Sequence, residues 1–298
     1  MTADTGHRSI DLLADRLHFP EGPRWHDGRL YVSDFYDRVV LAYRPDGSRT
    51  VVCEVPGQPS GLGFTPAGDL LISSMLDHKL LRYREGEVSE VADLSALVGG
   101  PCNDLHVDAA GRAYVGNFGS DMETSIDPTV LVRVDPDGSV AVAARDLVFP
   151  NGTVTTADGT LLISETFAYR ISAFDVDASG NLANRRVWAS FGGEPAPDLP
   201  TALATEAVAP DGVCLDAEGA LWVGDAQGTG AVRVREGGEI VDRVELDGLT
   251  AFAVALGGED GRTLYLAAGP PLGQIDPAAE RRGSLLSVRV DVPGAAWA

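Results

Sequence analysis

Short apolar segments alternate along the whole chain with turns rich in glycine, aspartate and proline. The apolar spacing of an amphipathic helix is nearly absent, whereas runs such as residues 70–72 and 161–163 fit strands buried on both faces. Asp-Gly pairs mark turns that require a positive φ, as at Asp137-Gly138, Asp158-Gly159 and Asp260-Gly261. The pattern therefore predicts an all-β fold of many short strands.

One motif recurs six times along the chain. Each copy is a short segment that is followed, in most copies seven or eight residues later, by a glycine-centred turn and then by an apolar strand. The 298 residues allow about 50 residues per copy, the size of a four-stranded propeller blade. We therefore predict a six-bladed β-propeller of four-stranded antiparallel blades, a single domain over residues 1–298. The six segments are Phe19-Pro20-Glu21-Gly22, Pro59-Ser60-Gly61, Cys102-Asn103-Asp104, Pro150-Asn151-Gly152, Pro210-Asp211-Gly212 and Thr250-Ala251-Phe252.

The two ends of the chain are expected to complete one blade together. The first blade has four strand patterns, at residues 22–26, 29–33, 38–44 and 50–55, but the last has only three, at 251–256, 262–267 and 284–290. Residues 8–13 can supply the missing outer strand. This closure would tie the ring shut and remove two open sheet edges.

Two blades carry extra length, at residues 120–129 and at about 189–209. In an up-and-down blade, the second-to-third loop lies on the face where the first strand begins. We expect both insertions to overhang this face, which we call the mouth, and loops on a rigid scaffold commonly carry specificity.

Equivalent positions of a closed radial repeat converge on one axis. The phase that carries Glu21, Ser60, Asn103, Asn151 and Asp211 therefore brings two acids and two amides to one point. Asn-Gly and Asp-Gly also form turns, but each blade already has its turn further along, and Glu is not a turn residue. Oxygen ligands without His or Cys favour Ca²⁺, with Mg²⁺, Mn²⁺ or Zn²⁺ as alternatives.

Composition excludes several classes of partner. The formal net charge of -21 disfavours nucleic acid and anionic membranes. Three scattered cysteines give no disulfide framework. The N-terminus lacks the pattern of a secretion signal, so we expect a cytoplasmic protein, a monomer or weak homo-oligomer, that acts on a small molecule. No nucleophile elbow, zinc-protease helix or phosphate loop is present in the sequence.

The chain resembles the senescence marker protein / gluconolactonase / luciferin-regenerating enzyme-like (regucalcin-like) family of six-bladed propellers over nearly its whole length. The resemblance implies a divalent metal held by Glu21, Asn151 and Asp211, with Asn103 contacting the substrate or a metal-bound water. Similar members hydrolyse lactones, and relatives of this architecture cleave phosphoesters. The matching stretches are residues 19–25, 103–112, 150–152, 184–186 and 210–219.

The chain departs from the sugar-lactonase pattern near the expected substrate. Pro101 stands where those enzymes have arginine, Leu105 where they have glycine, and Asp121 where they have the longer glutamate. Asp121, Phe118 and Phe167 are the expected substrate contacts together with Asn103. The mouth loops are rich in large apolar side chains, which suggests a substrate less polar than a free sugar lactone. These side chains are Phe35, Tyr36, Met75, Phe118, Met122, Phe167 and Tyr169.

These observations predict a metal-dependent hydrolase that opens a small, fairly apolar lactone or ester. Asp211 would ligate the metal and assist proton transfer, as base or as nucleophile. One alternative is a phosphotriesterase-like hydrolase that uses the same ring. The other is a non-catalytic propeller that binds calcium or a partner protein.

Overall fold

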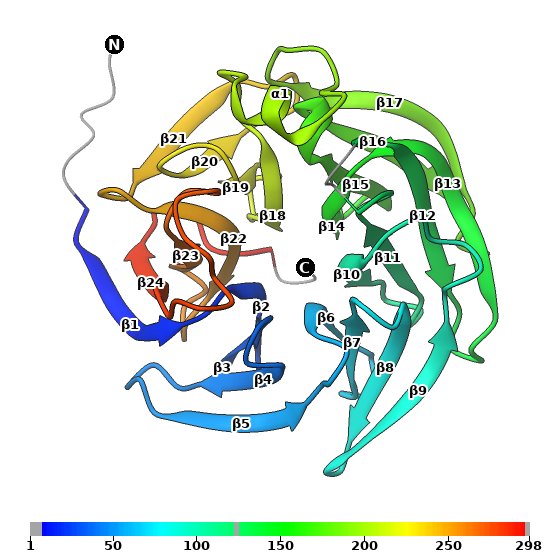
Figure 1. Cartoon of the computed structure of the whole chain (residues 1–298), viewed down its shortest axis with the longest axis horizontal. Coiled ribbons are helices and arrows are strands. Elements are labelled where there is room, and N and C mark those ends of the chain that lie inside the picture. Colours follow the sequence, from blue (N-terminus) through cyan, green and yellow to red (C-terminus); the bar gives the residue numbers. More distant parts are fainter. Residues whose placement is uncertain (1–7, 122–124, 296–298) are drawn as a thin grey trace.

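The computed structural model describes residues 8–121 and 125–295, and shows six four-stranded antiparallel sheets arranged radially around a central axis (Figure 1). The predicted six-bladed propeller is confirmed. Blade one contains β2 (Pro20–His26), β3 (Arg29–Asp34), β4 (Val39–Tyr43) and β5 (Arg49–Glu54). Blade two contains β6 (Pro59–Phe64), β7 (Leu70–Ser74), β8 (Lys79–Arg84) and β9 (Glu87–Asp93). Blade three contains β10 (Cys102–Val107), β11 (Ala113–Asn117), β12 (Pro128–Val134) and β13 (Val140–Val148).

The remaining blades follow the same inside-to-outside order. Blade four contains β14 (Pro150–Thr155), β15 (Thr160–Glu165), β16 (Arg170–Val176) and β17 (Leu182–Ser190). Blade five contains β18 (Pro210–Leu215), β19 (Leu221–Asp225), β20 (Gly230–Val234) and β21 (Ile240–Glu245). Blade six contains β22 (Thr250–Gly257), β23 (Thr263–Gly269), β24 (Gly283–Arg289) and β1 (Ile10–Leu17). A 3-10 turn, η1 (Thr166–Ala168), and one short helix, α1 (Leu199–Leu203), complete the described elements, and no helix among them is long and apolar enough to span a membrane.

The N-terminal strand closes the ring, as predicted. β1 pairs antiparallel with β24, and the register places Ile10 opposite Val288 and Leu12 opposite Leu286. The strand extends to Leu17, four residues beyond the predicted end at residue 13. The extension adds a contact, because Leu17 is buried and packs with Leu30 and Leu285 across the junction of blades one and six.

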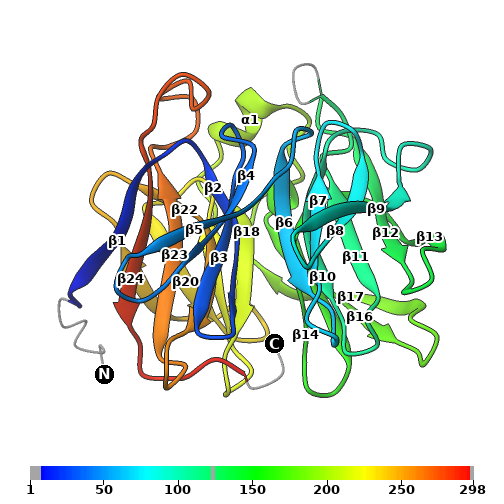
Figure 2. The same cartoon turned by 90° about the horizontal axis from the view of Figure 1, so that it is seen from below.

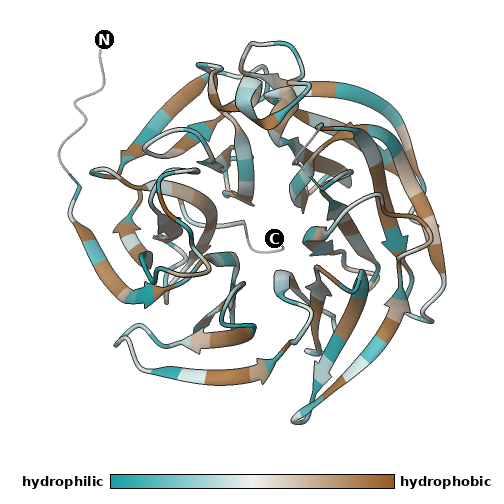
Figure 3. Ribbon diagram, viewed as in Figure 1, coloured by the Kyte–Doolittle hydropathy of each residue, from teal (hydrophilic) through white to brown (hydrophobic). Residues whose placement is uncertain are grey.

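Apolar side chains fill the spaces between neighbouring blades. Between blades four and five, Leu162 and Trp188 pack with Val213 and Val223. Figure 3 shows brown, apolar segments in the strands around the ring. Burial of both faces explains why the second strands read as continuous apolar runs rather than as alternating patterns.

Three loops rise over one face of the ring. Figure 2 places α1, within the predicted insertion 189–209, at the same end as the β11–β12 connection, which holds the predicted insertion 120–129 except for its last two residues. The connection between β23 and β24, residues 270–282, rises there too and was not predicted as an insertion. It is held to blade one, where Nδ1 of His18 lies 2.7 Å from the carbonyl oxygen of Pro277 and Arg281 pairs with Asp37.

The Asn184-Arg185-Arg186 stretch has a structural role on the outer edge of blade four. Arg185 and Arg170 both donate to the buried carboxylate of Glu165, at 2.7 and 2.8 Å. Burial raises the pKa of Glu165, but the hydrogen bonds from Arg170, Ser172 and Val148 and the charge of Arg185 outweigh it and hold the pKa below its usual value. The ionised carboxylate is therefore part of the folded structure of this blade.

We predict that deleting residues 1–14 lowers the melting temperature by on the order of 10 °C. The deletion removes most of β1 and leaves β24 with an unpaired edge. Thermal unfolding followed by circular dichroism measures the effect. Deletion of residues 1–7 alone, which stops short of β1, is the control and should leave the melting temperature unchanged. A 1–14 deletion that melts within a degree of the full chain would contradict a closing role.

We predict that Glu165→Gln lowers the free energy of unfolding by about 2–3 kcal/mol at pH 7, because it removes charge-assisted bonds to two arginines. A carboxylate with a lowered folded pKa contributes stability above its unfolded pKa and loses it as pH falls through the folded value. The difference between wild type and variant should therefore shrink below about pH 4. Urea titrations across pH measure this, and a difference that is constant down to pH 3 would contradict it.

Candidate functional site

The predicted ring residues lie at the starts of the inner strands, on the mouth side of the axis. Glu21, Ser60, Asn103, Asn151 and Asp211 occupy equivalent positions in β2, β6, β10, β14 and β18. All five side chains are buried. In blade six the adjacent pair is Ala251 and Phe252, both buried, so this blade brings no acid or amide to the ring.

A bulge interrupts each of these five inner strands at the ring residue or immediately after it. In blade five, Pro210 pairs with Asp225 and Val213 pairs with Val223, and Asp211 and Gly212 lie in the irregular stretch between. The same break follows Pro59, Cys102 and Pro150, and follows Glu21 in blade one. Bulges re-aim side chains, so the ring residues are freed from the alternation of an ordinary ladder.

The glycine after the ring residue allows neighbouring inner strands to approach backbone to backbone. A Cβ on Gly61 would lie 2.2 Å from the backbone nitrogen of Leu105, and one on Gly152 would lie 2.5 Å from the carbonyl oxygen of Asp211. Gly22 and Gly212 are equally confined, and Gly22 also has a positive φ of 56°. These Glu-Gly, Ser-Gly, Asn-Gly and Asp-Gly pairs are therefore close-approach positions and not hairpin turns.

Burial makes negative charge costly at both ring acids. Burial raises the pKa of Glu21 to about 8, with a further contribution from the charge of Asp104, against a hydrogen bond from the backbone N–H of Gly22. Burial also raises the pKa of Asp211 well above its usual value, and the charges of Glu21 and Asp104 add to this effect. A bound cation would reverse these shifts, so the chemistry of the donor set fits a metal site.

The two amides differ in their partners. Asn151 donates from Nδ2 to Oγ1 of Thr166 at 3.2 Å, which fixes the side chain, and its hydrogen bond with Asp211 favours the ionised acid. Asn103 accepts a hydrogen bond from Ser60 at 3.4 Å, while its buried Nδ2 has no partner among the described residues. Asn103 is thus left with a donor to offer to a bound molecule.

Asp104 is a charged residue near the ring that the sequence analysis did not assign. It stands where the other four blades have the close-approach glycine, and its buried carboxylate accepts from Arg24 of blade one at 3.0 Å. Arg24 also donates to the carbonyl oxygen of Leu105 at 2.8 Å. The signal was present in the repeat itself, because an acid replaces a glycine at one of five aligned positions.

The predicted substrate contacts divide between the core and the surface. Phe118 is half-buried and stacks on Phe149 with ring centroids 4.6 Å apart, and Phe149 in turn contacts Phe167 at 4.9 Å. Phe167 is buried within this aromatic cluster. Asp121 is exposed at the edge of the β11–β12 loop, next to residues 122–124, which the structure does not describe.

Most of the other apolar mouth residues belong to the core. Phe35, Met75 and Tyr169 are buried, Tyr36 is exposed, and Met122 lies outside the described residues. Large apolar side chains are nevertheless exposed in loops and in α1 at this end of the propeller, namely Tyr36, Leu76, Leu97 and Leu203. The mouth is therefore partly apolar, although through a different set of side chains than the predicted one.

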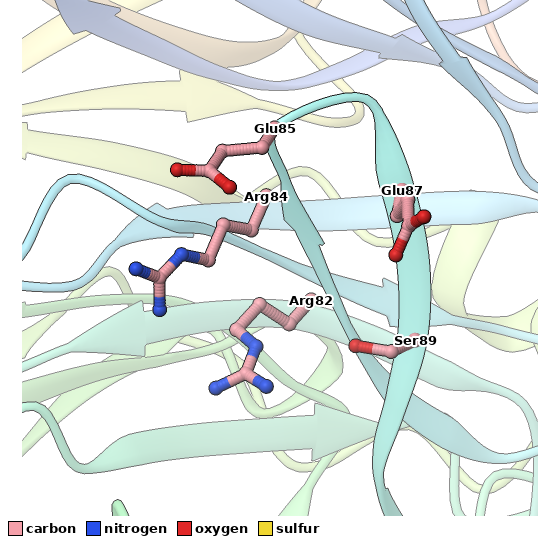
Figure 4. Close-up of a pocket in the computed structure, with 5 residues that line it drawn as sticks. All are labelled: Arg82, Arg84, Glu85, Glu87 and Ser89. Atoms are coloured by element: carbon pink, nitrogen blue, oxygen red, sulfur yellow. The ribbon is translucent and has the colours of Figure 1, made fainter.

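Two other features of the described residues bear on the search for a site. In residues 8–121 and 125–295, no three His, Cys, Asp or Glu side chains gather as a metal site, so a metal at the ring would need amide oxygens besides its two carboxylates. Figure 4 shows a cavity of about 280 Å³ between β8 and β9, lined by Arg82, Arg84, Glu85, Glu87 and Ser89. It lies at the outer edge of blade two. Its lining carries both positive and negative side chains and includes none of the predicted site residues.

Comparison with known proteins agrees with this architecture. Residues 19–269 match the family model described as SMP-30/Gluconolactonase/LRE-like region. The chain belongs to this family. It is 27% identical to regucalcin of Gallus gallus over 266 residues, covering 85% of this chain and 84% of that protein. It is 28% identical to pentonolactonase XacC of Haloferax volcanii over 83% of this chain and 80% of that protein.

Solved structures show the same fold at lower identity. A luciferin-regenerating enzyme is 20% identical, with a TM-score of 0.81 over 97% of this chain and 98% of that one. A calcium-binding regucalcin from Agrobacterium tumefaciens is 22% identical, with a TM-score of 0.79 over 97% of this chain and 96% of that one. The family match spans every ring position from Glu21 to Asp211.

Proposed function

We propose that the protein is a metal-dependent lactonase whose centre is the ring of Glu21, Asn103, Asn151 and Asp211. The observation that supports this most is the pair of buried carboxylates, Glu21 and Asp211, whose negative charge is made costly by burial and, at Asp211, also by the charge of Glu21. A fold with no use for a cation would gain stability by replacing either acid with a neutral residue. The names of two relatives, a pentonolactonase and a calcium-binding regucalcin, agree with the proposal.

Glu21, Asn151 and Asp211 would hold the metal, and their oxygen donors favour Ca²⁺. When bound, such an ion polarises a carbonyl oxygen and stabilises the negative charge that develops on it. Glu21 and Asp211 together balance the two charges of the ion. Thr166 keeps Asn151 in place through the 3.2 Å hydrogen bond to Nδ2, and the amide oxygen of Asn151 would be the ligand atom.

We assign proton transfer to Asp211. One of its carboxylate oxygens is needed as a ligand, and the other can take a proton from water or give one to the leaving alkoxide. The same oxygen could attack the carbonyl directly, so base and nucleophile remain two routes from one residue. Asn103 orients the substrate by donating from Nδ2, the buried amide group that has no partner among the described residues.

We further propose that the substrate is a small lactone or ester with an apolar substituent. Support comes from the exposed side chains of Tyr36, Leu76 and Leu203 at the mouth and from Pro101 and Leu105, which bring no charge close to Asn103. Phe118 and Asp121, in the β11–β12 loop, are the expected contacts beyond the ring. Phe167 would support Phe118 indirectly, because both rings contact Phe149.

We predict that the protein hydrolyses alkyl-substituted lactones with kcat/KM about tenfold above that for gluconolactone. A chelator should reduce turnover by at least about 100-fold, and added Ca²⁺ should restore it. A panel of lactones, aryl esters and phosphotriesters, assayed with and without chelator, measures both effects. Turnover of phosphotriesters alone would replace the proposal with the phosphotriesterase alternative. No turnover of any panel member, with calcium still bound, would favour the non-catalytic propeller.

We predict that Asp211→Asn and Glu21→Gln differ when metal is saturating. Both variants lose a ligand charge and should bind Ca²⁺ more weakly. Glu21→Gln should regain most of its turnover at high metal, because Glu21 is assigned metal binding alone. Asp211→Asn should stay about 10²–10⁴-fold below wild type, because the basic oxygen is lost. Turnover measured across a calcium titration separates the two, and full recovery of Asp211→Asn would demote Asp211 to a ligand.

A further inference from the structure

The last residue of each second strand lies at the mouth, beside the segment that leads into the inner strand of the same blade. The antiparallel pairing fixes this arrangement, since Asp34 pairs with Pro20, Glu165 with Pro150 and Asp225 with Pro210. The residues at this position differ from blade to blade. They are Asp34, Ser74, Asn117, Glu165, Asp225 and Gly269, for blades one to six.

In blades one, four and five this residue is an acid that accepts hydrogen bonds from backbone N–H groups. Asp34 accepts from His18 and Phe19, each at 3.0 Å. Glu165 accepts from Val148 at 2.9 Å. Asp225 accepts from Ala209 at 3.0 Å. We call these three contacts the acid clamps. Each one holds the chain two or three residues before a proposed metal ligand: Glu21, Asn151 or Asp211.

A proline at each of these points removes one backbone hydrogen bond, as Pro59 also does in blade two. Pro20, Pro150 and Pro210 immediately precede the three ligands and have no N–H to donate to the neighbouring strand. The entering segment must therefore be fixed before the proline. A backbone bond does part of this, from Phe35 to Phe19, from Thr166 to Phe149 and from Ala226 to Ala209, at 3.2, 3.3 and 3.0 Å. The acid adds bonds to the backbone N–H groups of the same short segment.

The clamp is missing from the other three blades, although two keep the backbone bond. Met75 donates to Gln58 at 2.8 Å, but Oγ of the adjacent Ser74 has no partner among the described residues. Phe118 donates to Pro101 at 2.9 Å, but Asn117 turns to the start of β12, where it accepts from Thr129 at 2.7 Å. Blade six has Gly269, which has no side chain.

The acid clamps thus occur in the same three blades as the proposed metal ligands. We propose that Asp34, Glu165 and Asp225 are positioning residues that fix the backbone of Glu21, Asn151 and Asp211 in the geometry the metal requires. This inference rests on the proposed function and adds residues to it that contact neither metal nor substrate. Partners one step away from metal ligands commonly change metal affinity by about 10–100-fold.

The alternative is that these acids only stabilise the fold, through their hydrogen bonds to backbone N–H groups. Blade five offers a matched control for this alternative. Asp216 is even more buried than Asp225, and it accepts two backbone hydrogen bonds, from Glu218 and Ala220, besides its bond from Arg233. It lies at the turn between β18 and β19, the opposite end from the ring. Asp216→Asn should therefore cost stability without reaching the ligands.

The test is calcium affinity, measured by isothermal titration calorimetry on the full chain, with melting temperatures recorded for every variant. We expect Asp34→Asn, Glu165→Gln and Asp225→Asn each to raise the Kd for Ca²⁺ by about tenfold. Asp216→Asn should keep the Kd within about twofold of wild type, even if its melting temperature falls as much as those of the three clamp variants. Three clamp variants are used so that the failure of one to fold leaves two measurements.

Two outcomes would overturn the inference while leaving the proposed function intact. One is a set of clamp variants that bind calcium as tightly as wild type. The other is an Asp216→Asn protein that loses as much affinity as they do, which would make the effect a general loss of stability. A wild-type protein that binds no divalent cation would overturn the metal centre and the clamps together.

Discussion

The approach of neighbouring inner strands around the axis is the constraint on which the rest of the structure depends. Gly22, Gly61, Gly152 and Gly212 leave no room for a side chain between one blade and the next, so the strands meet backbone to backbone. A narrow ring forces the residues that precede these glycines to share one small space. Outer strands, insertions and the closing strand then surround a centre whose dimensions this contact sets.

This geometry gives the ring an electrostatic character that the rest of the acidic surface lacks. Exposed acids are hydrated, whereas burial removes Glu21 and Asp211 from water and leaves them near other acids, Asp104 in both cases and also Glu21 in the case of Asp211. Arg24 offsets part of this negative charge through its ion pair with Asp104. At Asp211, the hydrogen bonds with Asn151 and with the backbone of Gly212 favour the ionised carboxylate. What remains is a surplus of negative charge in a buried place, which is the usual condition for holding a cation rather than a side-chain partner.

Periodic features could be predicted from the sequence, and features made by single long-range contacts could not. The blades and the ring phase repeat, so successive copies support one prediction. The closing strand was predictable because the repeat leaves the last blade one strand short. Asp104 breaks the repeat, and its role depends on the ion pair with Arg24, which lies 80 residues earlier in the chain. The acid at the end of a second strand looks like any strand-end residue until Pro20 or Pro210 is seen beside it. Phe167 and Tyr169 could not be separated from surface aromatics, because burial in this cluster depends on packing with Ala202 and the loop around it.

The pairing of β1 with β24 also orders events during synthesis. A ribosome releases β1 first and β24 last among the strands, so the sixth sheet stays incomplete until nearly the whole chain has emerged. Blades one to five can form earlier as an open arc, with Glu21 and Asp211 at opposite ends of it. The two acids come together only when the arc closes on the sixth blade. A nascent chain that still lacks the sixth blade therefore leaves the two acids apart, and closure of the ring completes the charged centre.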